Sequence, residues 1–406
     1  MERLLVINYR NMDVGGIENY VYYMIKQALR ENYRIIWLCD INPKISPVYE
    51  NLLNSVQVRK VYCNTHSFHW FTHSSLDLNK YDLIISISFN FMDHMRSLEL
   101  LNGIDCKNIV PIYMVPHFKG GLIFPETNFK YLSSIIRSII SKYYQKFIFS
   151  GEMIYMSKDH PDAIERAYDI KIKDSLRTLA PDFNVRRCYN DKPFISNYRR
   201  RDFYIVSAGR IEFPHKGYLL GLIDEFCDLK RKYENLKLII IGEGKDKKVL
   251  LEKLNNLTDY FAKDIIYKGN MSYENLLDFY QKCNLSVSVA GCAIASAKVG
   301  LLTLPCRHYT YKCEVYGFIP EAKEMITSEK PGKPVKEYIE RVLKMSEVEY
   351  LSLSKASYDC YKDGNSSIND LCKHDSIKKY YPSKAELLIV KTIYLFEKIN
   401  YYIKIF

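Results

Sequence analysis

Two cationic side chains follow an apolar run in the second half of the sequence. The run Phe203 to Ala208 predicts a buried strand, and Arg210 and Lys216 come directly after it, with a helical pattern behind Gly217. Ligands of open α/β sheets bind outside the carboxyl ends of the strands. A guanidinium offers a bidentate fork and an ammonium a point charge, and each charge-assisted bond contributes roughly 1.5 to 3 kcal/mol. The pair therefore predicts a diphosphate site, with two solvated surface cations as the alternative interpretation.

Two glycine turns lie at similar places, each directly after a predicted strand. Gly15 and Gly16 precede a helix whose N-terminus favours an anion, so a phosphate is expected there. Gly242 and Gly244 follow the apolar run Leu236 to Ile241, and here a base or ribose can approach the backbone closely. In both places a simple tight turn is the alternative interpretation.

One histidine also follows a predicted strand. His117 comes after the run Val110 to Val115, where its imidazole can hydrogen-bond a sugar hydroxyl or a backbone oxygen. A lone histidine more often has a structural role.

A possible metal-ligand cluster is rejected. Its spacing would gather ligands on one helix face, but the surrounding residues give no helical pattern and no second Cys/His pair completes a site. Its members are Cys63, His66, His69 and His73. We therefore predict no metal.

Strand and helix patterns alternate along the chain, which predicts parallel sheets covered on both faces. In the first half, the predicted strands are Leu4–Asn8, Arg34–Cys39, Leu83–Ser88, Val110–Val115 and Lys146–Phe149. In the second half they are Phe203–Ala208, Leu236–Ile241, Ile265–Lys268 and Leu285–Val289. We expect an α/β protein with a Rossmann-like domain at 1–185, a polar linker at 186–201, a second Rossmann-like domain at 202–380 and a C-terminal helix at 381–406 that packs back toward the first domain.

Composition narrows the class of protein further. The 406 residues exceed what one hydrophobic core usually fills, and the 48% hydrophobic and 26% charged content is ordinary for a globular chain. Eleven scattered cysteines without a Cys-x-x-Cys pair indicate free thiols in a reducing compartment. No apolar run reaches membrane-spanning length, so we expect a cytoplasmic protein. The net charge of +11 favours anionic partners, but no nucleic-acid motif is present and none of that class is predicted.

Together these residues resemble the retaining GT-B glycosyltransferases of family 4, which have two Rossmann-like domains and use a nucleotide-sugar donor. Gly15 and Gly16 look like the family's glycine loop, while Arg210 and Lys216 look like its diphosphate-binding cations. The turn at Gly242 and Gly244 matches the one after the next strand. His117 falls where the family often has a histidine that faces the donor sugar.

The sequence departs from the family at a pair of glutamates that normally contact the donor sugar and the ribose. Aligned on Pro305, the two positions hold Ala290 and Lys298, and neither is a carboxylate. A lysine donates hydrogen bonds and accepts none, so it suits a phosphate rather than a ribose. The donor-site residues expected in this segment are Gly291, Ala293, Ile294 and Lys298.

The resemblance implies a metal-independent sugar transfer without an added cofactor, from a UDP- or GDP-linked donor to a carbohydrate or lipid-linked acceptor, in bacterial surface polysaccharide biosynthesis. The segment Ser133 to Lys142 alternates isoleucines with cations, so a peripheral contact with an anionic inner membrane face is one interpretation and a core-facing helix the other. A non-catalytic binding or scaffold subunit that has lost the donor site is the alternative function.

Overall fold

The chain forms two units, each built around its own sheet. The computed structural model describes residues 2–13, 15–63, 76–106, 108–115, 130–156, 159–181, 183, 202–322, 325–326, 328, 330–361, 366–372 and 380–393. By its contacts, the first unit comprises Met1–Asp13, Tyr20–Asn184 and Asn365–Phe406. The second comprises Val14–Asn19 and Val185–Gly364. The second domain was expected to reach 380, whereas here the chain joins the first unit from Asn365 onward.

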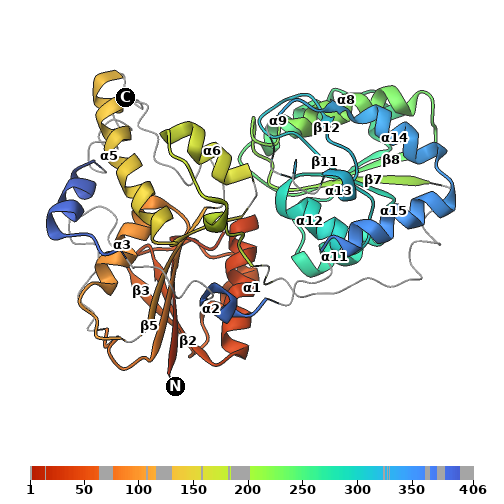
Figure 1. The fold of residues 1–406 in the computed structure, drawn as a ribbon. Helices are drawn as coiled ribbons and strands as arrows, with labels where there is room; N and C mark the ends of the chain where they lie inside the picture. The colour runs from red at the N-terminus through yellow and green to blue at the C-terminus, as the bar shows by residue number, and fades with distance from the viewer. Residues whose placement is uncertain are drawn as a thin grey trace. The chain divides into compact units, whose positions relative to one another are not determined.

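The first unit contains a six-stranded parallel sheet of order β3-β2-β1-β4-β5-β6 (Figure 1). Its strands are β1 (Arg3–Asn8), β2 (Tyr33–Cys39), β3 (Val58–Tyr62), β4 (Leu83–Ser88), β5 (Asn108–Val115) and β6 (Met153–Tyr155). Its helices are α1 (Gly16–Arg30), α2 (Pro47–Leu53), α3 (Phe91–Leu101), α5 (Lys130–Phe149) and α6 (Asp159–Tyr168), with the short turns η1 (Asp174–Leu176) and η3 (Ile368–Cys372).

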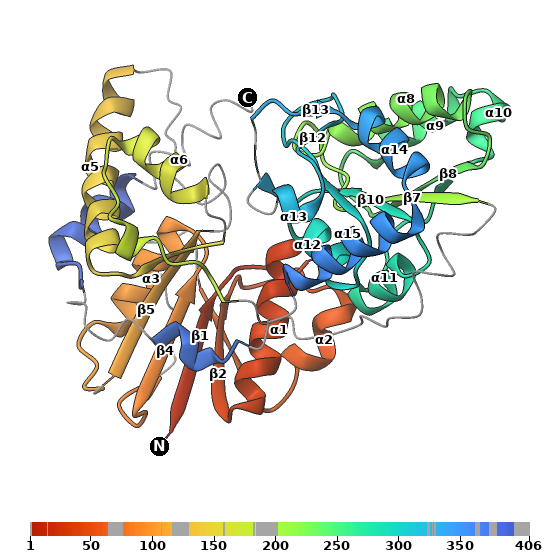
Figure 2. The ribbon, with the colours of Figure 1, turned by 45° about the vertical axis from the view of Figure 1, so that its right-hand side comes forward.

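The second unit contains a five-stranded parallel sheet of order β11-β10-β7-β8-β9. Its strands are β7 (Phe203–Ala208), β8 (Leu236–Ile241), β9 (Ile265–Tyr267), β10 (Leu285–Ser288) and β11 (Thr303–Pro305), and a small antiparallel pair joins β12 (Glu314–Val315) to β13 (Lys333–Pro334). Its helices are α8 (Tyr218–Lys230), α9 (Lys247–Asn255), α10 (Asp259–Ala262), α11 (Tyr273–Tyr280), α12 (Ala290–Lys298), α13 (Ile319–Ala322), α14 (Val335–Lys344) and α15 (Glu347–Asp359). Figure 2 shows α8 and α14 on one face of the sheet and α11 and α12 on the other.

The strands are apolar along their whole length because helices cover both faces of each sheet. All six residues of β4 are buried, for example, as are the last four of β8. In both units the first strand lies inside the sheet, and the next strands run outward from it in one direction before the order reverses. This is the doubly wound Rossmann arrangement, so the predicted fold class is confirmed.

One predicted strand is wrong. Lys146–Phe149 belongs to the end of α5, and the sixth strand is β6, which follows a few residues later. The apolar residues there recur at helical spacing, because Tyr144, Phe147 and Ile148 all pack into the core of the first unit. Ile136 and Ile140 of the same helix are buried as well, as a core-facing helix requires. Among the described helices, none combines the length and apolarity needed to span a bilayer.

The C-terminal part of the chain is anchored on the first unit by contacts with carboxylates and with its core. Glu31 accepts hydrogen bonds from the Ser367 hydroxyl at 2.8 Å and from the Ile368 amide at 3.2 Å. Farther along, Lys391 lies 2.8 Å from Glu99 of α3, and Leu387 is buried in the same core as α5. These contacts explain why the chain after Gly364 belongs to the first unit.

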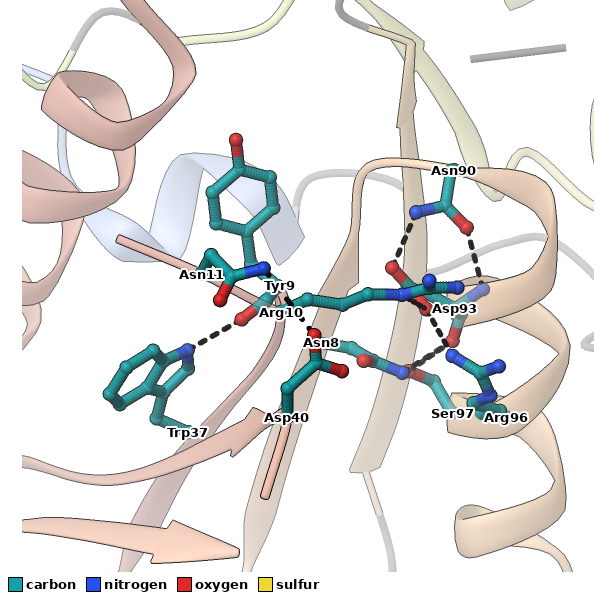
Figure 3. A network of polar contacts seen from close by, with 10 residues as sticks. All are labelled: Asn8, Tyr9, Arg10, Asn11, Trp37, Asp40, Asn90, Asp93, Arg96 and Ser97. Atoms are coloured by element: carbon teal, nitrogen blue, oxygen red, sulfur yellow. Dashed lines mark hydrogen bonds and ion pairs between the residues drawn. The ribbon is translucent and has the colours of Figure 1, made fainter. Parts of the chain in front are cut away.

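A buried polar network occupies the point where the strand order of the first sheet reverses, between β1 and β4 (Figure 3). Arg96 donates to the Asp93 carboxylate at 2.6 Å, and both side chains are almost fully buried. Arg10, which follows β1, lies 3.5 Å from the same carboxylate oxygen. Asn90 caps α3 by accepting from the Asp93 amide at 2.9 Å, and Asn8 donates to the Asp93 carbonyl at 2.6 Å. One carboxylate thus joins the end of β1 to the first turn of α3.

We expect Asp93→Asn to destabilise the first unit by about 3 to 5 kcal/mol, because it leaves the buried Arg96 guanidinium without its counter-ion. Both tryptophans, Trp37 and Trp70, belong to this unit, so urea unfolding followed by tryptophan fluorescence reports on it selectively.

Asp174→Asn is the matched control, because Asp174 and Arg177 have the same i,i+3 spacing in the same unit but the carboxylate is fully exposed. We expect an unchanged unfolding midpoint for this variant. Equal midpoints for Asp93→Asn and the unchanged protein would contradict the role given to the network.

Candidate functional site

The second sheet has its own reversal point between β7 and β10, and the two predicted cations lie beside it. Ligands of doubly wound sheets bind at the carboxyl ends of the strands at this point. Gly209, Arg210 and Lys216 belong to the loop that follows β7, and α12 begins close after the end of β10. The structure therefore brings the predicted cations and Gly291 to the same edge of one sheet.

Lys216 is held against the turn after β7. Its amide donates to the Glu212 carbonyl at 2.8 Å, which fixes the backbone just before α8. A Cβ placed on Gly209 would lie 2.6 Å from the Lys216 Nζ, so the ammonium occupies the space that a side chain would fill. Among the described residues, this ammonium makes no hydrogen bond or ion pair, and the nearby Glu212 carboxylate pairs with Lys245 instead. Burial is the largest cause that lowers the pKa of Lys216, and the charge of Arg210 adds to it, while the nearby Glu212 acts in the opposite direction.

Arg210 is more exposed, with 43% of its side chain accessible. Its guanidinium lies 3.4 Å from the carboxylate of Glu18, and residues 14–19 group with the second unit. Glu18 is only 7% exposed and follows the predicted glycine loop in the first turn of α1. A Cβ on Gly15 would collide with both Glu18 and Arg210, whereas Gly16 has open space around it. The glycine loop and one of the two cations therefore lie together.

The turns after β7 and β8 pack backbone against backbone, which explains their glycines. Gly242 has φ +142°, and a Cβ there would overlap the Gly209 carbonyl. A Cβ on Gly244 would overlap the Ile211 carbonyl in the same way. Larger residues would push these turns apart and move the loop that carries Lys216.

The residues of α12 that were predicted to line the donor site do not all lie at the same end of the helix. Ala290 opens the helix with φ +49° and donates its amide to the Ile326 carbonyl at 2.8 Å. A Cβ on Gly291 would meet no atom within 4 Å, so the first turn is open at this position. Ala293 is buried against α13, and Ile294 packs beside it. Lys298 is 5% exposed in the last turn, about 12 Å along the helix from Ala290, so the structure does not bring it to the strand edge.

The remaining predictions fall on residues that the structure does not describe. His117 lies outside the described residues, as do His66, His69 and His73 of the rejected metal cluster. Within the described part of the chain, no three His, Cys, Asp or Glu side chains gather in a way that would hold a metal ion.

No carboxylate is available along the strand and helix beside Gly291. Residues 279–313 contain neither aspartate nor glutamate, and this range covers β10, α12 and β11. Shifting the alignment on Pro305 by a few residues therefore places no acidic residue at the two positions, Ala290 and Lys298, where the family normally has glutamates. Any carboxylate at this site has to come from another element.

Sequence reasoning missed one such carboxylate. Glu243 lies between the two predicted glycines, and its carboxylate receives hydrogen bonds from Lys247 at 2.8 Å and from Tyr267 at 2.9 Å. The i,i+4 spacing of Glu243 and Lys247 was a usable signal. Tyr267 comes from the next strand, and its contribution depends on the sheet register, which the sequence does not give.

A family model confirms the resemblance over the part of the chain that carries the site. The model described as glycosyl transferases group 1 matches residues 190–291. This range includes both predicted cations, the glycine turn after β8 and the start of α12. Among curated proteins, none matches this sequence.

Solved structures share the fold of more than nine tenths of the chain at low sequence identity. WaaG, a glycosyltransferase involved in lipopolysaccharide biosynthesis, is 13% identical with a TM-score of 0.57, and the match covers 93% of this chain and 100% of that one. A TarM variant from S. aureus, solved with UDP, is 10% identical with a TM-score of 0.55, covering 92% and 99%. The N-terminal domain of a trehalose-6-phosphate phosphatase from Candida albicans is 11% identical with a TM-score of 0.57, covering 93% and 97%.

These likenesses show the fold, which serves proteins of more than one description, while the family match falls on the residues of the site itself. Together the two findings show that the chain has the fold of the GT-B glycosyltransferases and that its residues 190–291 match the group 1 glycosyl transferase model.

Proposed function

We propose that the protein transfers a sugar from a UDP- or GDP-linked donor to a carbohydrate or lipid-linked acceptor, with retention of configuration and without a metal. The donor diphosphate binds at the reversal point of the second sheet. Arg210 and Lys216 contact it, and the glycine turns at Gly242 and Gly244 receive the nucleoside. His117 is proposed to contact the donor sugar.

The observation that carries this proposal is the environment of Lys216. An ammonium that is partly buried against Gly209, beside a second cation and with no ion pair within 4 Å in the described chain, is costly in the free protein, although the nearby Glu212 reduces that cost. A bound diphosphate removes this cost, because an opposite charge within about 4 to 6 Å favours the charged form of the lysine. The site is therefore complementary to a ligand with concentrated negative charge.

The same two cations also suit the chemistry of transfer. When the bond between the sugar and the diphosphate breaks, negative charge develops on the leaving phosphate. Fixed cations aimed at that charge lower the barrier without having to reorganise. Arg210 provides two donors in a planar fork, and Lys216 provides a point charge at the base of the turn. No side chain is assigned as a nucleophile or a base.

The pathway is proposed from similar proteins. WaaG acts in lipopolysaccharide biosynthesis, and we propose bacterial surface polysaccharide as the product here. A cytoplasmic location and a peripheral contact with the inner membrane face belong to this proposal, because they would bring the enzyme to a lipid-linked acceptor. The isoleucines Ile136 and Ile140 of α5 do not serve that contact, since both are buried.

The alternative proposal is a binding or scaffold subunit that has lost catalysis. It is supported by the absence of carboxylates from residues 279–313, where the family normally has two glutamates. The two proposals differ in product formation, because both retain the fold and a scaffold needs no turnover.

We expect Arg210→Ala and Lys216→Ala each to weaken binding of UDP or GDP by about 10- to 100-fold, as the loss of one charge-assisted bond implies. Isothermal titration with both nucleotides measures the affinity, and product formation from a panel of UDP- and GDP-sugars measures turnover. Both variants should lose most of their activity.

Lys232→Ala is the control for these substitutions, because Lys232 is 59% exposed and pairs with Glu340 on the surface of the same unit. It should bind nucleotide like the unchanged protein. Full affinity and turnover in both site variants would rule out the proposed mechanism. If the unchanged protein binds nucleotide but forms no product from any donor in the panel, the scaffold proposal is supported instead.

The lowered pKa of Lys216 gives a pH dependence with a definite sign. Diphosphate affinity should fall as the pH rises and the ammonium deprotonates, beginning below the ordinary lysine value of 10.5. Lys216→Arg should remove this fall, because a guanidinium stays charged. Titrations from pH 7 to 10 on both proteins separate the lysine from ionisation of the nucleotide, and parallel curves would refute the assignment.

Metal independence follows from the two cations and is tested separately. We expect sugar transfer by the purified enzyme to continue at an unchanged rate in excess EDTA. Loss of activity in EDTA that returns with Mg²⁺ or Mn²⁺ would show that Arg210 and Lys216 do not suffice to neutralise the leaving diphosphate.

A further inference from the structure

The carboxylate of Glu243 is fixed at the carboxyl edge of the second sheet, between the ends of β8 and β9. Lys247 and Tyr267 both donate to its Oε1, at 2.8 and 2.9 Å. The Tyr267 hydroxyl also lies 2.9 Å from the Gly242 carbonyl, which places it over the turn after β8. Two neighbours thus define where this side chain lies before any ligand arrives.

The second carboxylate oxygen is open. Among the described residues no donor contacts the Glu243 Oε2, and 39% of the side chain is exposed. Gly269, at the end of β9, lies directly beside it, because a Cβ there would be 3.3 Å from Oε1. The Lys247 ammonium holds the pKa of Glu243 below its usual range. At neutral pH the group is therefore an ionised acceptor, oriented and accessible.

A ribose requires an acceptor of this kind. Its 2′ and 3′ hydroxyls are neighbouring donors, and a carboxylate accepts from both. Residues 279–313 contain no acidic side chain for this purpose. Glu243 supplies one from the opposite side of β7.

The spacing of the strands fits a nucleoside diphosphate. Lys216 lies against the end of β7 and Glu243 beside the end of β9, which is two strands away in the sheet. Neighbouring strands are about 4.8 Å apart, so the two groups are separated by about 10 Å along the edge. The turn at Gly242 lies between them and packs against the Gly209 carbonyl.

We propose that Glu243, oriented by Tyr267 and Lys247, binds the ribose hydroxyls of the donor and makes the site select ribonucleotides over 2′-deoxyribonucleotides. This inference rests on the proposed function, since it requires the diphosphate at Lys216.

The test compares UDP and GDP with their 2′-deoxy forms by isothermal titration. We expect the unchanged protein to prefer the ribose form, and Glu243→Gln to bind UDP or GDP about 10-fold more weakly and to lose most of that preference. Binding of inorganic pyrophosphate should not change, because its contacts lie at Lys216. Tyr267→Phe should show a smaller loss of the same kind, since the carboxylate is retained but less well oriented.

Glu340→Gln is the matched control, because Glu340 also accepts from a lysine at 2.8 Å and is 31% exposed, but on α14. A preference for ribose that persists in Glu243→Gln would overturn the inference while leaving the proposed function intact. If the unchanged protein binds neither nucleotide, the proposed function fails and the inference fails with it. A thermal midpoint for Glu243→Gln equal to that of Glu340→Gln excludes misfolding as the cause of weaker binding.

Discussion

The account of this protein depends on one electrostatic imbalance at the edge of the second sheet. Lys216 packs against a glycine, beside Arg210, and among the described residues its ammonium makes no ion pair, since the nearby Glu212 pairs with Lys245. In the free protein this arrangement is unfavourable, because desolvation and a neighbouring like charge both disfavour a cation. The fold retains it at the place where doubly wound sheets bind their ligands. Complementarity to a diphosphate is the purpose that we propose for this arrangement.

The two sheets use their reversal points in different ways. In the first, Asp93 neutralises Arg96 and joins β1 to α3 through hydrogen bonds, so the charge there serves stability. In the second, the corresponding point has glycine turns, an open helix start at Gly291 and the Lys216 ammonium, which makes no ion pair among the described residues. The same topology thus supports a structural network in one unit and the proposed ligand site in the other.

The sequence predicted the fold class and the position of Arg210 and Lys216 after a buried strand, because both depend on local order along the chain. Continuous apolar runs indicated buried parallel strands, and Arg210 and Lys216 directly follow one of them. The predicted strand at Lys146–Phe149 was wrong because a short apolar run has the same composition in a buried helix as in a strand. Contacts between residues far apart in the sequence could not be predicted from local patterns either. Tyr267 orients Glu243 across a strand pair, and Glu31 captures Ser367 from the far end of the chain.

The most direct test of the central claim is a crystal structure of the protein with bound UDP or GDP. The account predicts a phosphate oxygen about 2.7 to 2.9 Å from the Lys216 Nζ, the range for a charge-assisted hydrogen bond. A nucleotide bound at another edge of the molecule, with the Lys216 ammonium turned to solvent, would contradict it.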